Sequence, residues 1–303
     1  MACVKWLGNS DCPGWHCPCG DVCLNVSVHE CQTVNNSAVR LMGACLRLIG
    51  LLAHVLGAFI AAGVFPVMSL SAQQRFLQWW SCGLLKCLKV HHQHCGVPVP
   101  AGDVAALLVA NHVSWLDIFA INVVTPACFV AKSEVRSWPV VGWLVRRSGA
   151  LFIRRAVRSD TVRVNTLVGA KLQQGRAVAL FPQGTSTRSG QPVQFHAPML
   201  QSAIATGARV QPIALYYHDQ NGCSHESAAY VDDMSFVQSL WKIACTPDLQ
   251  VTVSYLPSVD TAGLDRRAVA AVAQQVVNEA LARQLKSGHS LADQRHQNAI
   301  KAP

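Results

Sequence analysis

The sequence has few charged residues for its length. Only 14% of its 303 residues are Asp, Glu, Lys or Arg, against about 25% in an average soluble protein. Hydrophobic residues make up 51% of the chain, and its mean hydropathy is +0.25. This composition excludes disorder as the dominant state and favours a chain that buries apolar surface in a core or against lipid. The length allows one large domain with an appendage.

The chain also lacks internal repeats, low-complexity tracts and a G-x-S-x-G motif, and without that motif a hydrolase is disfavoured. Acidic residues are scarce, 16 against 25 Lys and Arg, which gives a formal net charge of +9. Residues 130–190 hold eleven basic residues and two acidic ones, and we call these Lys and Arg the basic belt. We expect it to attract phospholipid headgroups, a phosphorylated cofactor or an acidic carrier protein. Nucleic acid is not expected, because aromatic residues do not interleave with the basic ones.

Cysteine is concentrated at the N-terminus, with six of 13 in the first 31 residues. The others are scattered, as in a reduced, cytosolic domain. The early set includes the residue types of a zinc site, namely Cys12, His16, Cys17, Cys19 and Cys23. However, paired C-x2-C steps are missing and the C-x-C step is cramped, so no metal is expected. We interpret residues 1–41 as a non-native or disordered extension read from an early start codon, because Met42 opens a stretch typical of a membrane-anchored N-terminus.

A long apolar run follows. Residues 48–70 contain no Asp, Glu, Lys or Arg and would reach about 35 Å as a helix, enough to cross a bilayer core. Residues 73–88 then place aromatic and Leu side chains at helical spacing, as in an interfacial helix, although an ordinary core-facing helix has the same pattern. Basic residues on both flanks fit a pair that dips into one leaflet as well as a span. We predict that residues 42–90 form a membrane-anchoring helix pair. A signal peptide is disfavoured because no small-x-small cleavage site follows.

Beyond residue 90, short apolar runs alternate with helical patterns, which predicts an α/β domain over residues 91–285 and a polar tail over 286–303. The expected strands are Ala105–Ala110, Ala127–Ala131, Leu151–Arg154, Ala177–Phe181, Val210–Tyr216 and Leu249–Tyr255. The expected helices are Asp160–Gln174, which ends before Gly175, and Asp265–Leu285, with Val269, Val272, Val276, Ala280 and Leu281 on one face.

His112 and Asp117 form an H-x4-D pair directly after the expected strand AALLVA. Polar groups at this end of an open α/β sheet commonly build the active site. In the functional interpretation, His112 is a general base and the Asp117 carboxylate orients and stabilises its imidazole. In the structural alternative, Ser114 and Asp117 are a helix-capping pair, and the two roles are compatible. Ser114 is too close to His112 in sequence to be a free nucleophile, so direct transfer between two substrates is the economical mechanism.

A second polar cluster is FPQGTSTRSG, residues 181–190, which follows another expected strand. Main-chain N–H groups at Gly184 and Thr185, with Arg188 nearby, suit a phosphate or an oxyanion. A plain polar turn between a strand and a helix is the alternative.

The order of these motifs resembles the PlsC-type lysophospholipid acyltransferase family over roughly residues 41–285. NHVSWLD at 111–117, GALFIRR at 149–155, FPQGTST at 181–187 and VQPIAL at 210–215 are similar to its four blocks. The resemblance implies a mixed sheet flanked by helices, an acyltransferase domain over 91–285, a catalytic His112 assisted by Asp117, and a phosphate-handling Arg155. The substrate-binding residues it implies are Asn111, Arg155, Phe181, Pro182, Gln183, Gly184, Thr185, Arg188 and Pro212.

The implied reaction is acyl transfer from acyl-CoA or acyl carrier protein, as co-substrate, to the free hydroxyl of a lysophospholipid. The expected acceptor is 1-acyl-sn-glycerol-3-phosphate, the expected partners are membrane lipids and the acyl donor, and no cofactor is needed. We expect the enzyme at the cytoplasmic membrane, with the catalytic domain on the cytosolic face.

Three positions depart from the family pattern. Gln183 stands where Glu is usual, Ser186 stands where many members have Arg, and Arg154 stands where Asp is common. These changes alter the groups expected to grip the acceptor headgroup, so lyso-ornithine lipid is an alternative acceptor. A second alternative is an inactive lipid-binding protein on the same fold, against which the intact NHVSWLD block argues.

Overall fold

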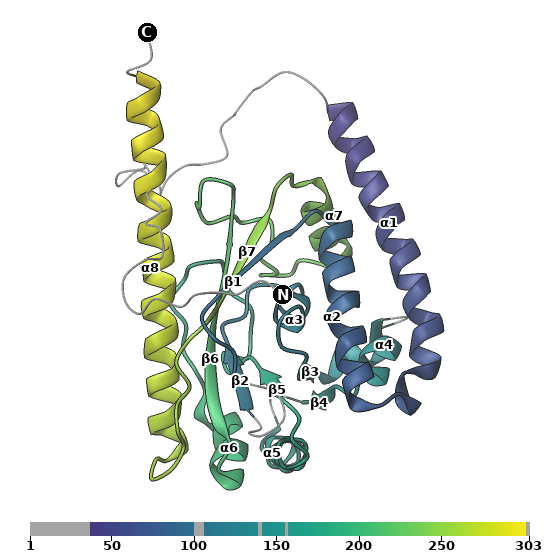
Figure 1. Cartoon of the computed structure of the whole chain (residues 1–303), viewed down its shortest axis with the longest axis vertical. Helices are drawn as coiled ribbons and strands as arrows, with labels where there is room; N and C mark the ends of the chain where they lie inside the picture. The colour runs from purple at the N-terminus through teal and green to yellow at the C-terminus, as the bar shows by residue number, and fades with distance from the viewer. Residues whose placement is uncertain (1–36, 100–105, 139–140, 155–156, 301–303) are drawn as a thin grey trace.

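The computed structural model describes residues 37–99, 106–138, 141–154 and 157–300. At its centre is a seven-stranded sheet in the order β1-β7-β6-β2-β5-β3-β4, with helices on both faces (Figure 1). β6 and β7 pair antiparallel and the other neighbours pair parallel, so the sheet is mixed, as predicted. The strands are β1 (His91–Cys95), β2 (Ala106–Ala110), β3 (Cys128–Lys132), β4 (Leu151–Ile153), β5 (Val178–Leu180), β6 (Arg209–His218) and β7 (Gln250–Tyr255).

The helices form an outer layer on each face of the sheet. They are α1 (Ser37–Val64), α2 (Leu70–Cys87), α3 (Asp117–Asn122), α4 (Val141–Arg147), α5 (Arg158–Gln173), α6 (Gln201–Thr206), α7 (Phe236–Cys245) and α8 (Arg266–Ile300), with short 3-10 turns at Phe65–Val67, Ser133–Ser137 and Ala197–Leu200. One core lies between the sheet and α2, α3 and α7, and a second lies between the sheet and α5, α6 and α8. Figure 1 shows α8 and the α1–α2 pair on opposite sides of the sheet.

The central strands are apolar because both of their faces are covered. Every residue of β2 is buried, and its side chains point alternately into the two cores. β6 does the same, so that Tyr216 lies in the core beside α8 and Tyr217 lies in the core beside α3. Adjacent residues of β6 therefore serve opposite faces of the sheet.

All six predicted strands are present, with ends shifted by no more than two residues where the structure describes them. β1 was not predicted. Its sequence, HHQHC, has no hydrophobic period because it is a half-exposed edge strand that pairs only with β7 within the described residues. Four helices were also missed, namely α3, α4, α6 and α7, three of which have fewer than eight residues.

The C-terminal helix differs from its prediction mainly in length. α8 begins at Arg266, as expected, but continues to Ile300, so residues 286–300 are helical rather than a frayed tail. Val272 is 41% exposed, while Ala273 and Val277 are fully buried. Val269, Ala280 and Leu281 are buried and Val276 packs against the core, so the predicted apolar face is confirmed except at Val272.

The N-terminal helices confirm only part of the predicted membrane anchor. The segment Leu41–Phe59 of α1 is long and apolar enough to cross a membrane, and only 17% of it is buried in the protein. α2 and the residue that follows it instead place Leu84, Leu85 and Leu88 in the core, as in the core-facing alternative. A helix pair acting as an anchor is thus not confirmed. α1 begins before Met42, and the Cys-rich segment with its candidate zinc residues lies outside the described residues.

Candidate active site

The H-x4-D pair lies at the carboxyl edge of the parallel strands. His112 comes two residues after β2, and Phe181 directly follows β5, which is paired in parallel with β2. β6 flanks β2 on its other side, also in parallel. The ends of three neighbouring strands therefore bring residues near positions 112, 183 and 217 together, at the place where open α/β sheets bind their ligands.

The imidazole of His112 is held by a buried carboxylate. Nδ1 of His112 lies 2.7 Å from Oδ2 of Asp117, and the Asp117 side chain is fully buried while that of His112 is 17% exposed. Because an ionised carboxylate only accepts hydrogen bonds, Nδ1 is the donor of this contact, and in the neutral imidazole the lone pair then lies on Nε2. Within the described residues, Nε2 has no hydrogen-bond partner, so this nitrogen is available to accept a proton.

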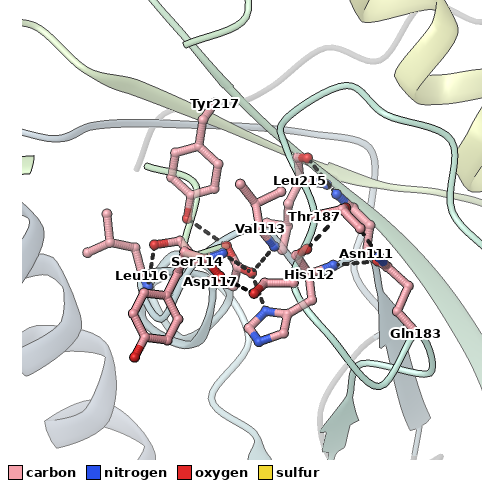
Figure 2. Close-up of polar contacts among 12 residues, drawn as sticks. Asn111, His112, Val113, Ser114, Leu116, Asp117, Gln183, Thr187, Leu215 and Tyr217 are labelled. Carbon is pink, nitrogen blue, oxygen red and sulfur yellow. Dashed lines mark hydrogen bonds and ion pairs between the residues drawn. The ribbon is translucent and has the colours of Figure 1, made fainter. Parts of the chain in front are cut away.

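Three further groups donate to Asp117. The main-chain N–H groups of Val113 and Ser114 lie 2.8 and 3.0 Å from Oδ2, and the hydroxyl of Tyr217 donates to Oδ1 over 2.8 Å (Figure 2). These donors satisfy the hydrogen-bonding capacity of a carboxylate that is buried away from water. Burial and the neighbouring Asp117 charge raise the pKa of Tyr217 well above its ordinary value, so this phenol stays protonated and donates.

The contacts of the capping alternative are present in part, although α3 itself begins at Asp117 and has Leu116 as its N-cap with no side-chain cap. Asp117 accepts from the Ser114 N–H, as the acidic member of a capping pair does, while Ser114 Oγ accepts from Leu116 N at 3.3 Å. The start of α3 and the histidine contact therefore use the same carboxylate.

The main chain of His112 is fastened to the FPQGTSTRSG segment. Gln183 is buried, and its Oε1 accepts from His112 N at 2.8 Å while its Nε2 donates to Thr187 Oγ1 at 3.2 Å. Thr187 N in turn donates to His112 O at 2.8 Å. The Phe181 ring stacks on the His112 imidazole with 4.2 Å between ring centroids. The neutral amide at position 183 thus joins two loops, and both of its polar atoms are engaged within the protein.

Two other residues of the four sequence blocks lie in or contact the sheet. The side-chain amide of Asn111 accepts from Leu215 N at 2.7 Å and donates to Leu215 O at 2.9 Å, which extends the pairing of β2 with β6 beyond the strand end. Pro212 is buried within β6, and its carbonyl accepts from Leu256 N. Both residues are held within the sheet, and the substrate-binding role that the resemblance implies for them stays a prediction.

The rest of the 181–190 segment forms a tight turn. Gly184 has a φ of +76°, in the left-handed region that favours glycine. Pro182 is buried, Thr185 is exposed, and Ser186 Oγ donates to the carbonyl of Tyr230. This turn brings Thr185 to the surface beside the His112 loop.

Arg188, expected to bind an anion, already has anionic partners. Its guanidinium lies 2.6 Å from Glu226 and 3.8 Å from Asp232. Both acidic residues come from the segment between β6 and α7. A substrate phosphate would therefore compete with two carboxylates for this cation.

Arg155 lies outside the described residues, but its neighbour Arg154 does not. The Asp160 carboxylate accepts from Arg154 N at 2.6 Å and from Arg163 Nε at 3.0 Å, and these contacts lower the pKa of Asp160 to about 2. The other acidic residue of the 130–190 segment, Glu134, pairs with Lys132 at 3.1 Å. Both acidic residues of the 130–190 segment thus pair with members of the basic belt.

Sequence reasoning identified His112 and Asp117 but missed Tyr217, the residue that completes the carboxylate's hydrogen bonds. Its signal was a polar group in a buried strand, which is visible only once the two faces of β6 are assigned. Among the described residues, no group of three His, Cys, Asp or Glu side chains is arranged to hold a metal ion.

Comparison with known proteins shows the family to which the chain belongs. A family model described as Acyltransferase matches residues 89–216. The chain is 34% identical over 252 residues to lyso-ornithine lipid O-acyltransferase of Pseudomonas aeruginosa, a match that covers 80% of this chain and 94% of that protein. The chain belongs to the acyltransferase family. The resemblance seen in the four sequence blocks is therefore confirmed, and the protein is an acyltransferase.

Other members of the acyltransferase family carry a second name. The 1-acyl-sn-glycerol-3-phosphate acyltransferase of Neisseria gonorrhoeae is 37% identical over 172 residues, which cover 57% of this chain and 67% of that protein. The crystal structure of the 1-acyl-sn-glycerophosphate acyltransferase PlsC from Thermotoga maritima has the same fold, with a TM-score of 0.55 and 22% identity over 78% of this chain and 96% of that chain.

Proposed function

We propose that this acyltransferase moves an acyl group from acyl-CoA or acyl carrier protein to the free hydroxyl of a lysolipid, with His112 as the general base. The observation that carries the proposal is the 2.7 Å contact between Nδ1 of His112 and the buried Asp117 carboxylate. It fixes the tautomer that leaves Nε2 ready to accept a proton.

In the proposed reaction, Nε2 takes the proton of the acceptor hydroxyl while its oxygen attacks the thioester carbonyl carbon. The C–S bond then breaks, the thiolate leaves, and the imidazolium returns the proton to the sulfur. Asp117 stabilises the imidazolium between these two transfers. The imidazole supplies the base, so the proposed reaction uses no metal ion or resident cofactor.

The first candidate acceptor is 1-acyl-sn-glycerol-3-phosphate, which would give phosphatidate. Two Neisseria relatives at 37% identity carry this activity in their names. The basic belt supports it, since its surplus of nine positive charges would attract a phosphate headgroup.

Lyso-ornithine lipid is the second candidate acceptor, and two observations favour it. The relative that spans most of both chains carries this name. In addition, Arg188 is paired with Glu226 and Asp232, and Gln183 carries no charge. A headgroup without phosphate would need no further cation at these positions.

Membrane attachment through α1 also belongs to the proposal. Its outward face exposes large apolar side chains, each more than half exposed: Leu41, Met42, Leu46, Ile49, Leu52 and Leu56. The acyl donors are cytosolic whereas the acceptor resides in a bilayer, so we place the enzyme on the cytosolic face of the cytoplasmic membrane. There α1 would lie in lipid and the basic belt would attract anionic headgroups.

The test is an assay of the purified full-length enzyme with each acceptor, using both acyl-CoA and acyl carrier protein donors. We expect turnover with one acceptor, and we expect His112→Ala to lower it by about 10²–10⁴-fold, the typical contribution of a general base. Circular dichroism of the variant checks that the fold persists. A variant with near wild-type rates would refute the mechanism, and wild-type protein that binds both lipids without turnover would support the lipid-binding alternative.

A further inference from the structure

The two oxygens of the Asp117 carboxylate have unequal surroundings. Oδ2 accepts from Nδ1 of His112 and from the main-chain N–H groups of Val113 and Ser114. Oδ1 accepts from the Tyr217 hydroxyl at 2.8 Å, which is its single donor among the described residues. Figure 2 shows the phenol reaching the carboxylate from the side opposite the imidazole.

The main chain of Tyr217 is itself held by several hydrogen bonds. It is fully buried in β6, where it pairs with Val251 of β7. Ser189 Oγ accepts from Tyr217 N at 2.8 Å and donates to Tyr217 O at 2.9 Å, and His225 N donates to the same carbonyl. Because Ser189 belongs to the FPQGTSTRSG segment, the phenol is fixed relative to both loops of the site.

We propose that Tyr217 is a positioning residue for acyl transfer: its hydroxyl fixes the Asp117 carboxylate so that Oδ2 faces His112, and it shares the carboxylate's negative charge. This inference rests on the proposed role of His112 as the base. Tyr217 lies behind the carboxylate and does not contact the imidazole, so it acts through Asp117 and not on the substrate.

The effect of Tyr217 on the His112–Asp117 pair can be measured because the other groups in contact with His112 are uncharged. From β5 and its loop, His112 meets the uncharged Phe181 and Gln183. The segment between β6 and α7 contacts this loop through the main-chain N–H of Tyr230, which donates to Val113 O. Within the described residues, Asp117 is the one charged side chain that contacts His112.

Removing the hydroxyl has a defined electrostatic consequence. A carboxylate with one donor fewer holds its charge less stably, so the His112–Asp117 pair binds a proton more tightly. The acidic limb of the kcat/KM profile therefore moves to higher pH in Tyr217→Phe, by roughly 0.5–1 unit, the pKa equivalent of one hydrogen bond. At the pH optimum we expect kcat to fall about tenfold, with KM unchanged because the substrate is not touched.

The chain offers a matched control in the next residue. Tyr216 points into the other core, where its hydroxyl donates to Gly222 O at 3.1 Å. Tyr216→Phe removes the hydroxyl of another buried tyrosine from the same strand, so it reports the general cost of the change. We expect its pH profile to match that of the wild type.

The experiment measures kcat, KM and the pH profile for the wild type, Tyr216→Phe, Tyr217→Phe and His112→Ala, with the acceptor and donor that the enzyme uses. NMR titration of the His112 imidazole, by comparison with His112→Ala, reads its pKa without turnover. A second variant, Tyr217→3-fluorotyrosine, keeps the ring and makes the hydroxyl a stronger donor. In that variant the acidic limb should move to lower pH, and the pKa of the imidazole should fall.

The outcomes separate this inference from the proposed function. Opposite shifts in the two Tyr217 variants, with none in Tyr216→Phe, support positioning through Asp117. An unchanged profile and imidazole pKa in both Tyr217 variants, with His112→Ala inactive, overturns the inference and leaves the general base in place. Full activity of His112→Ala overturns the proposed function itself. If Tyr217→Phe does not fold, an unshifted fluorotyrosine variant still overturns the inference.

Discussion

Gln183 illustrates how a single neutral side chain can organise a site. Its amide accepts from His112 N and donates to Thr187 Oγ1, so it ties the H-x4-D loop to the segment after β5. We expect Gln183→Ala to lower the free energy of unfolding by about 1–3 kcal/mol, because the partly buried His112 N–H loses its acceptor. Chemical denaturation in detergent measures this change, and kcat should fall with it because the His112 loop loosens.

Gln194→Ala is the matched control for this prediction. Gln194 is exposed and makes no hydrogen bond within the described residues. Its replacement should change the free energy of unfolding by less than about 0.5 kcal/mol. Equal stabilities of the two variants would show that the Gln183 amide does not hold the loop.

For single residues, a contact between positions close together in the sequence could be predicted, and a contact between distant positions could not. His112 and Asp117 are five positions apart, so a local motif could place them in contact. Tyr217 is one hundred positions beyond Asp117, and its contact depends on the order of strands in the sheet. The resemblance implied a substrate-binding role for Gln183, whereas its hydrogen bond from the His112 main chain carries no sequence signal.

Among the elements, α1 carries the clearest expectation about lipid. Leu46, Ile49 and Leu56 are 63, 62 and 56% exposed on one face of the helix. Replacing all three by Ser should shift the protein from the membrane pellet to the soluble fraction, since each Leu or Ile buried in lipid contributes about 1.5–3 kcal/mol. The activity on bilayer acceptors should fall more than the activity on detergent-dispersed ones.

Val162→Ser supplies the control for α1. Val162 is 64% exposed on α5, which packs on the opposite face of the sheet. This variant should partition like the wild type. Retention of the triple variant in the pellet after a carbonate wash would contradict attachment through α1.

The same elements show why hydropathy alone does not establish an anchoring helix pair. The apolar residues of α2 recur at helical spacing, and this pattern is identical for a helix that faces lipid and one that faces a core. Leu84, Leu85 and Leu88 face the core, so deleting the whole stretch 48–88 would remove part of the catalytic domain's interior. Substitutions on the exposed face of α1 test the contact with lipid without removing residues of the core.

For the whole molecule, the described contacts predict that the N-terminal extension is dispensable. The sheet, both cores and the His112 loop are built from residues after Met42, while α1 begins only five residues before it. Expression from Met42 should give a folded enzyme with wild-type kcat and KM. Loss of activity, or stoichiometric zinc in the purified full-length protein, would show that residues 1–41 have a function.

The α/β class of the molecule could be predicted because its buried parallel strands are short, continuous apolar runs. The edge strand β1 could not be predicted, because a half-exposed strand does not require apolar residues. The full length of α8 was also hidden, because residues 286–300 are polar and a helix of polar residues leaves no hydrophobic period.

The loop that carries the histidine has no regular secondary structure, yet its main chain is almost fully engaged. His112 N and O, Val113 N and O, and Ser114 N and O all have hydrogen-bond partners. The conformational entropy of this loop is therefore lost once, when the chain folds, and not again at each encounter with a lipid. An enzyme that meets its acceptor by lateral diffusion then needs no loop-ordering step before chemistry, and its turnover can follow the arrival of substrate.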